Sequence, residues 1–150
     1  MSKLQRGFSL VSAIFLLVVL SALGAMMVTF FTAQQQSSAL DVLGARAYQA
    51  ARAGVEWAAY RVAQTPQTVP ATKWAGCDTI TNPLFAAGTL AKTLSPFNVV
   101  VTCTSSAYTE GSAGPTIYIY DITSTATGVN GAAPGSANYV ERVINVKMGK

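Results

Sequence analysis

The sequence predicts an α+β fold in which one long N-terminal helix packs on a small antiparallel sheet. Three observations predict it. Residues 8–31 form an uninterrupted apolar run, residues 40–62 repeat small and apolar side chains at spacings of three and four, and three runs rich in β-branched residues follow residue 96. Spacings of three and four mark one face of a helix, and β-branched runs are typical of strands.

The apolar run is long enough to cross a membrane. No charged residue occurs between Arg6 and Asp41. As a helix, residues 8–31 would be roughly 36 Å long at ~1.5 Å per residue, which exceeds the ~30 Å hydrocarbon thickness of a bilayer. The hydroxyl side chains in the run can bond to carbonyls of the preceding turn and so cost little in lipid. We expect one membrane span over about residues 8–31, because the run is too long and too uniformly apolar for the core helix of a soluble protein.

The short segment before the run sets its orientation. It carries Lys3 and Arg6 and no acid, which holds this end on the cytoplasmic side. An ordinary secretory signal has an apolar region of about 7–15 residues followed by a small-residue cleavage site. Here the run is longer and leads into the Gln- and Ser-rich residues 33–38, with no nearby Cys for a lipoprotein anchor. We therefore expect the rest of the chain to lie outside the cytoplasm.

The junction Gln5-Arg6-Gly7-Phe8-Ser9-Leu10-Val11 resembles the class III signal of type IV prepilins, which has a short basic leader, then Gly, then Phe, then an apolar helix. The resemblance implies that a membrane peptidase cuts after Gly7 and methylates the new terminal amine on Phe8, so that residues 1–7 are a leader peptide. Gly suits a cut site because a backbone without a side chain can enter a narrow active site. The resemblance also implies a type IV pilin-like fold.

One position departs from the pilin pattern. Type IV pilins usually carry Glu at the fifth residue of the mature chain, where it is thought to pair with the terminal amine of a subunit already in the filament. Counted from Phe8, this chain has Ser12 there. A carboxylate left unpaired in lipid is costly, and a subunit with no neighbour above it gains nothing from one. This favours a minor pilin that sits at the tip or primes assembly. The alternative is a subunit that incorporates poorly.

Two further stretches extend the resemblance. Ala53-Gly54-Val55-Glu56 resembles a segment of larger minor pilins and pseudopilins, and residues 6–20 resemble minor pilin-like proteins of the mannose-sensitive haemagglutinin (MSHA) pilus. The resemblance implies a structural role in pilus assembly and initiation. It implies storage in the inner membrane with the C-terminus periplasmic, then transfer to the extracellular pilus. The implied partners are prepilin peptidase, the inner-membrane assembly platform, and other major and minor pilins through the apolar helix.

Two alternatives stay open. A tip pseudopilin of type II secretion shares the anchor, the head and the missing Glu. A single-pass membrane protein with a periplasmic binding domain would share the anchor but keep its leader.

Charge gives no sign of a nucleic-acid partner. The formal net charge is +4, but Lys3 and Arg6 would leave with the leader, and the remaining eight basic and six acidic residues give only +2. Those charges are scattered, with no Lys/Arg cluster. We expect no nucleic acid to bind.

The two cysteines are expected to form a disulfide. Cys77 and Cys103 both follow the membrane segment, and disulfides persist outside the cytoplasm. Two free buried thiols are the alternative. Cys103 ends the first predicted strand, so a bridge would tie the connecting segment to the sheet.

Nothing in the sequence suggests an enzyme. The chain has no His, which excludes Ser-His-Asp and Cys-His arrangements and makes a structural zinc site improbable. The six acids form no cluster, and neither a P-loop nor a calcium-loop motif occurs. We expect no catalysis, no metal and no cofactor.

The chain beyond the membrane segment should form one small head. The helix is expected from Ser9 to Ala63, within a helical region 8–63, and Thr65-Pro66 should stop it. Its Ala- and Gly-rich face should let the sheet approach closely. Trp57 and Tyr60 are expected to pack against the sheet or a loop.

The head itself should span residues 64–150. Short helical turns are expected near 84–87 and 90–92, strands at 97–104, 116–123 and 139–148, and loops at 108–115 and 126–136.

Overall fold

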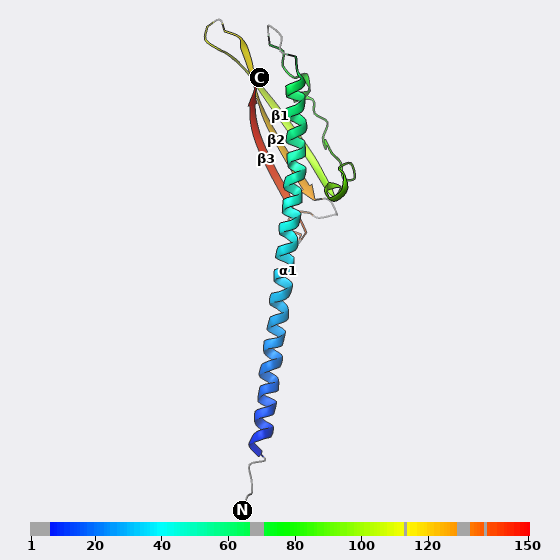
Figure 1. Ribbon diagram of the computed structural model, residues 1–150, viewed down its shortest axis with the longest axis vertical. Coiled ribbons are helices and arrows are strands. Elements are labelled where there is room, and N and C mark those ends of the chain that lie inside the picture. Colours follow the sequence, from blue (N-terminus) through cyan, green and yellow to red (C-terminus); the bar gives the residue numbers. More distant parts are fainter. Residues whose placement is uncertain (1–6, 67–70, 113, 129–132, 137) are drawn as a thin grey trace, which may run out of the picture. The chain divides into compact units, whose positions relative to one another are not determined.

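The structure is a computed structural model that describes residues 7–66, 71–112, 114–128, 133–136 and 138–150, with side chains described from residue 10 onward. The chain divides into two compact units, residues 1–39 and 40–150. Among the described residues, the first unit contains the N-terminal part of helix α1, and the second contains the rest of α1 and a sheet (Figure 1).

Helix α1 runs from Gly7 to Gln64 without interruption, close to the predicted 9–63. It contains no Pro, so no backbone donor is missing from its interior. It ends two residues before Pro66, and Thr65 N donates to Val62 O at 3.1 Å. The position of the first Pro therefore sets where the helix stops.

The sheet has three antiparallel strands in the order β1-β2-β3. They are β1 (Phe97–Thr109), β2 (Thr116–Gly128) and β3 (Glu141–Gly149). The middle of the register pairs Val101 with Ser124 and Ser124 with Ile144. An α+β arrangement of one long helix and a small antiparallel sheet is confirmed.

Both hairpin strands are longer than predicted. Residues 126–128 were expected in a loop but belong to β2, where Ala126 is fully buried and Gly128 N donates to Val140 O at 3.0 Å. Residues 108 and 109 likewise extend β1 and pair with Ile117 and Thr116. Cross-strand pairing thus overrides the weak strand propensity of the small residues in these stretches.

The connecting segment holds two short 3-10 turns, η1 (Ala75–Asp78) and η2 (Lys92–Leu94). The helical turn predicted at 84–87 is wrong, because Phe85 forms a β-bridge with Val99. Val99 N donates to Phe85 O at 2.9 Å. Phe85 therefore takes its backbone partner from the edge of the sheet instead of from a local helical turn.

The core lies between one face of α1 and the inner face of the sheet. Apart from Val62 and Ala126, its members are small on the helix and larger on the sheet: Ala47, Ala50, Ala51, Ala58 and Val62 face Val99, Val101, Tyr120, Ile122 and Ala126. The predicted helix stripe is confirmed from Ala47 onward. Leu40, at its beginning, is 37% exposed.

Gly54 marks the closest approach of helix and sheet. A Cβ added there would lie 2.4 Å from Ser124 Oγ, 2.8 Å from Val99 Cγ1 and 2.9 Å from Val101 Cγ2. No real side chain fits at such distances. The helix can therefore cross the sheet here only because the residue is Gly.

Candidate functional site

The first candidate surface is the apolar part of α1 in the first unit. Each side chain from residue 10 to residue 39 is exposed, and the large apolar ones range from 37% exposed at Val19 to 69% at Leu17. Within the described residues, one helix is long and apolar enough to cross a membrane, with a window of mean hydropathy 2.6 that is 0% buried. By length and composition, this surface is compatible with a single membrane span.

Three hydroxyls on this surface, those of Ser21, Thr29 and Thr32, bond to carbonyls of the helix itself. Ser21 Oγ donates to Val18 O at 2.9 Å, and Thr29 Oγ1 donates to Met26 O at 2.7 Å. Such bonds to the preceding turn remove the cost of placing a hydroxyl among hydrocarbon chains. The surface therefore presents these polar residues to an apolar neighbour without an unmet donor.

The sequence-predicted processing residues lie at the start of α1. Gly7 and Phe8 fall in its first turn, whereas leader residues 1–6 are outside the described residues. Ser12, the position of the missing Glu, is an exposed residue of the same helix. The processing junction therefore stays a prediction from sequence.

Cys77 and Cys103 form a disulfide, as predicted. Their Cα atoms are 5.0 Å apart, and the two residues are 2% and 8% exposed. The bond joins η1 to β1 across a sequence separation of 26 residues. It holds the connecting segment against the sheet.

Aromatic residues fill the space between the end of α1 and η1. The Trp57 and Trp74 rings meet edge to face with centroids 5.9 Å apart, and the Arg61 guanidinium lies 5.9 Å from the centroid of Trp57. Trp74 is 7% exposed, and its backbone N donates to Tyr120 Oη at 2.9 Å. Trp57 packs as predicted, but Tyr60 is 60% exposed, so its predicted packing is wrong.

A hollow of about 410 Å³ borders this aromatic pair and is also lined by Ile80, Thr81 and Leu84. Four of its nine lining residues, Trp57, Trp74, Ile80 and Leu84, belong to the core or pack against it. Its geometry points to packing of the connecting segment.

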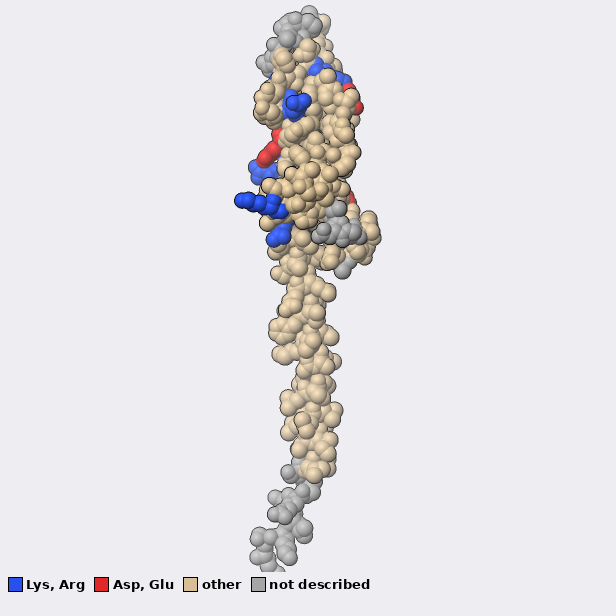
Figure 2. Space-filling model, turned by 90° about the vertical axis from the view of Figure 1, so that its right-hand side faces the viewer, with Lys and Arg blue, Asp and Glu red and all other residues tan. Residues whose placement is uncertain are grey.

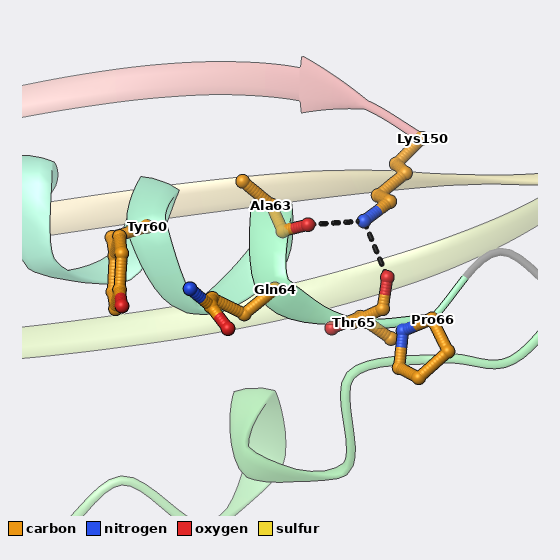
Figure 3. A pocket seen from close by; sticks show the side chains of 6 residues that line it. All are labelled: Tyr60, Ala63, Gln64, Thr65, Pro66 and Lys150. Atoms are coloured by element: carbon orange, nitrogen blue, oxygen red, sulfur yellow. Dashed lines mark hydrogen bonds between the residues drawn. The ribbon is translucent and has the colours of Figure 1, made fainter.

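Lys150 caps the C-terminal end of α1, a contact that we did not predict from the sequence. Its Nζ donates to Ala63 O at 2.6 Å and to Thr65 O (Figure 3). It also donates to Val62 O at 3.0 Å. The last carbonyls of a helix lack intrahelical partners and carry partial negative charge, so an ammonium satisfies them well. The hollow around it, about 710 Å³ and lined by Tyr60 and Pro66 among others, therefore already holds its cation. No local sequence signal predicts this contact across 85 or more residues.

Charged side chains lie over the second unit (Figure 2). Three oppositely charged pairs join described residues. Arg52 Nε and Glu56 Oε1 are 2.7 Å apart, Lys147 Nζ and Asp121 Oδ2 are 3.3 Å apart, and Lys73 bonds to Asp78. The Asp78 hydrogen bond raises the pKa of Lys73. Within the part of the chain that the structure describes, no group of three His, Cys, Asp or Glu residues could hold a metal ion.

No family model, no curated protein and no solved structure matches this chain.

Proposed function

We propose that this chain is a structural minor pilin of a type IV, MSHA-like pilus that acts in pilus assembly and initiation. The observation that carries the proposal is the continuous helix α1. Its first part exposes an apolar surface suited to lipid, and its second part is the spine of a disulfide-bonded sheet domain. The leader-like junction at Gly7 and Phe8 supports the same class, and residues 6–20 resemble the minor pilin-like protein MshP.

The physics of such a helix fits storage in a membrane followed by assembly. An exposed apolar helix needs either lipid or a bundle of like helices around it. Transfer between the two exchanges one apolar environment for another, so extraction need not expose the helix to water. The proposed partners are therefore other pilins through this surface, the assembly platform that moves the subunit, and prepilin peptidase.

Ser12 supports a position at the tip or a priming role. A shaft subunit would use a carboxylate at this depth to meet the terminal amine of the subunit above it, and Ser12 carries no charge. Immunogold labelling of sheared pili tests this position. We expect label at fibre ends, and label along the shaft would contradict it.

Mass spectrometry of the N-terminus tests the class. The full chain is expressed with and without a prepilin peptidase. We expect a chain that starts at methylated Phe8 only when the peptidase is present. Gly7→Leu should block the cut because its side chain obstructs entry of the backbone, whereas Ser9→Ala should be cut like the wild type. An uncut chain under both conditions would leave a membrane-anchored domain instead.

A cut chain still leaves a secretion pseudopilin as the competitor. Deleting the gene separates the two. Loss of surface pili with normal protein secretion supports the pilus, and loss of secretion with normal pili supports the pseudopilin.

A further inference from the structure

The two edges of the sheet are treated differently. The outer edge of β1 is occupied at Val99, which bonds to Phe85, and at Val101, whose N donates to Asn82 Oδ1 at 2.9 Å. Farther along the same strand, Cys103 carries the disulfide to η1. The outer edge of β3 has no backbone partner among the described residues. Unpaired strand edges are templates for another strand, and proteins usually cover or blunt them.

The register identifies the unpaired groups of β3. Tyr118 and Lys150 exchange two backbone bonds, of 2.7 and 2.9 Å, and Gly128 N donates to Val140 O. Hydrogen-bonded and non-hydrogen-bonded residue pairs alternate along an antiparallel pair of strands. The backbone N–H and C=O groups of the even-numbered residues of β3 therefore point toward β2. The N–H and C=O groups that face outward belong to Glu141, Val143, Asn145, Lys147 and Gly149.

The same alternation leaves one open stretch on β1. Its outward groups belong to the odd-numbered residues, as the bonds at Val99 and Val101 show. Beyond Cys103, these are Ser105, Ala107 and Thr109, and none has an outward backbone partner in the described part of the chain. One sheet therefore carries a long open edge and a short open edge, which run in the same direction.

We infer that the β3 edge of one copy receives residues 105–110 of a second copy as a parallel strand, a contact beyond the proposed pilin role. In a parallel ladder, a residue whose backbone groups face the partner stands opposite one whose groups face away. Odd residues of β3 then stand opposite even residues of β1. This places Lys147 opposite Glu110, Asn145 opposite Tyr108 and Val143 opposite Ser106, with all of these side chains on the outer face.

Charge selects this register. Lys147 pairs with Asp121 at 3.3 Å through a side chain that is 75% exposed, so its ammonium can also meet a second carboxylate from a neighbouring strand. No ion pair between described residues involves Glu110, and opposite charges facing each other across strands are favourable. The neighbouring pairs bring together hydroxyl, amide and apolar side chains without a like-charge clash.

The direction of pairing follows from assembly into one fibre and rests on the proposed function to that extent. An antiparallel pairing of two β3 edges would also place Glu141 opposite Lys147. It would, however, point residues 40–64 of α1 in opposite directions in the two copies, which subunits that enter one fibre in the same orientation cannot adopt. The parallel contact keeps both helices aligned, and it joins unlike surfaces, so each pair leaves one edge of each kind free.

The spacing of the two copies permits the contact. Three strands at ~4.8 Å displace the second copy sideways by about 14 Å, more than the 8–10 Å at which helices pack. Within one copy, Lys147 pairs across the strands with Asp121, and Asp121 pairs with Thr104. Placing Lys147 opposite Glu110 of the second copy therefore shifts that copy along the strands by six residues, about 20 Å at ~3.3 Å per residue.

Cysteine cross-linking of the detergent-solubilised full-length chain tests the register. Two full-length copies with different tags are co-expressed, one with Asn145→Cys and the other with Tyr108→Cys, and mildly oxidised. We expect a dimer that carries both tags. The matched control replaces Tyr108→Cys by Thr104→Cys, which is exposed on the same face but about 13 Å from the expected position. We expect at least about tenfold less dimer with the control, since a disulfide requires Cα atoms within about 7 Å.

Three outcomes would overturn the inference. They are equal yields at positions 108 and 104, a dimer formed by Asn145→Cys alone, and cross-linking only to a different protein. Running the same pairs without prepilin peptidase separates this inference from the proposed function. Cross-linking of an uncut chain that peptidase never processes would sustain the contact and remove the pilin role.

Four substitutions, each added to the cross-linking pair, sharpen the result. Val143→Pro removes an outward N–H and leaves the bonds to β2 intact, whereas Val143→Thr keeps that N–H. We expect the Pro variant to lower dimer yield about tenfold and the Thr variant to leave it unchanged. Lys147→Glu in the first copy should also lower the yield, and Glu110→Lys in the second should restore it. Failure of the charge exchange to restore the dimer would contradict the register.

Discussion

The two halves of α1 are both helical, but their apolar side chains differ in size and in burial. In residues 10–31 the apolar side chains are large and exposed, and in residues 47–62 the core-facing side chains are small and buried. Burying a large side chain contributes about 1.5–3 kcal/mol wherever an apolar neighbour exists, so the first half suits lipid or other helices. The small side chains of the second half bury little apolar surface area themselves. Its small residues let the sheet approach, so that Tyr120, Ile122 and Val99 are buried completely. Side-chain size therefore decides which neighbour each half takes.

Glycine substitution should separate the two halves most strongly. Gly54→Val places methyl groups where a Cβ alone would already be 2.4 Å from Ser124 Oγ, and we expect it to destabilise the head by about 4 kcal/mol. Gly24→Val is the control, because nothing lies within 4 Å of an added Cβ there. Thermal unfolding of the detergent-solubilised chain, followed through the near-UV signal of the two Trp residues, measures both. Similar midpoints for the two variants would contradict the close crossing at Gly54.

Removing the disulfide should destabilise only the head. Replacing Cys77 and Cys103 together by Ser frees a loop of 26 residues, and chain entropy predicts a loss of about 3–4 kcal/mol. Denaturant unfolding of the head measures the change. Reducing the wild-type chain should have the same effect, and a reductant should have no further effect on the double variant. The helical signal of the apolar segment should stay constant throughout.

The lysine cap should matter less than either. Lys150→Met removes the donor that satisfies three carbonyls around the end of α1, and we expect a loss of about 1–2 kcal/mol. Lys147→Met is the matched control, since its pair with Asp121 is exposed and worth at most about 0.5 kcal/mol. Hydrogen exchange at the last turn of α1 should rise in the Lys150 variant alone. Unchanged exchange there would mean that water satisfies these carbonyls equally well.

The smallest effect should be a gain. Ser124 Oγ is fully buried and is the one buried side-chain polar atom without a hydrogen-bond partner among the described residues. Ser124→Ala removes a desolvated hydroxyl at almost constant shape, so we expect the head to become more stable by up to about 1 kcal/mol. Thr123→Ala, on the outer face of the same strand, serves as the control. A clear loss of stability in the Ser124 variant would reveal a bond to this hydroxyl.

Local patterns predicted the elements that depend on local chemistry. The apolar run, the stripe from Ala47 to Val62 and the stop before Pro66 all follow from sequence spacing. The core face of β2 was also predictable, since Tyr120 and Ile122 alternate with outward residues. Features set by distant partners were not predictable. Gly128 and Phe85 adopt extended structure because the sheet offers them a partner.

The candidate site divides in the same way. The pairing of Cys77 with Cys103 followed from there being two cysteines in one compartment, whereas the cap by Lys150 joins residues far apart in sequence. Arg142 shows both sides. The sequence shows that it interrupts the alternating apolar residues Val140, Ile144, Val146 and Met148. Its guanidinium lies against Gly44, 3.0 Å from where a Cβ would be. Only the structure shows that the missing side chain of Gly44 makes room for it.

The crossing at Gly54 has an evolutionary consequence. The backbone of α1 and the side chains of Ser124, Val99 and Val101 occupy one small volume. A larger residue at any of these positions must be matched by a smaller one at another, so single substitutions that add volume there are blocked and paired ones are open. Descendants of this chain should therefore change these positions together, or keep all of them, while the lipid-suited half of α1 drifts freely among large apolar residues.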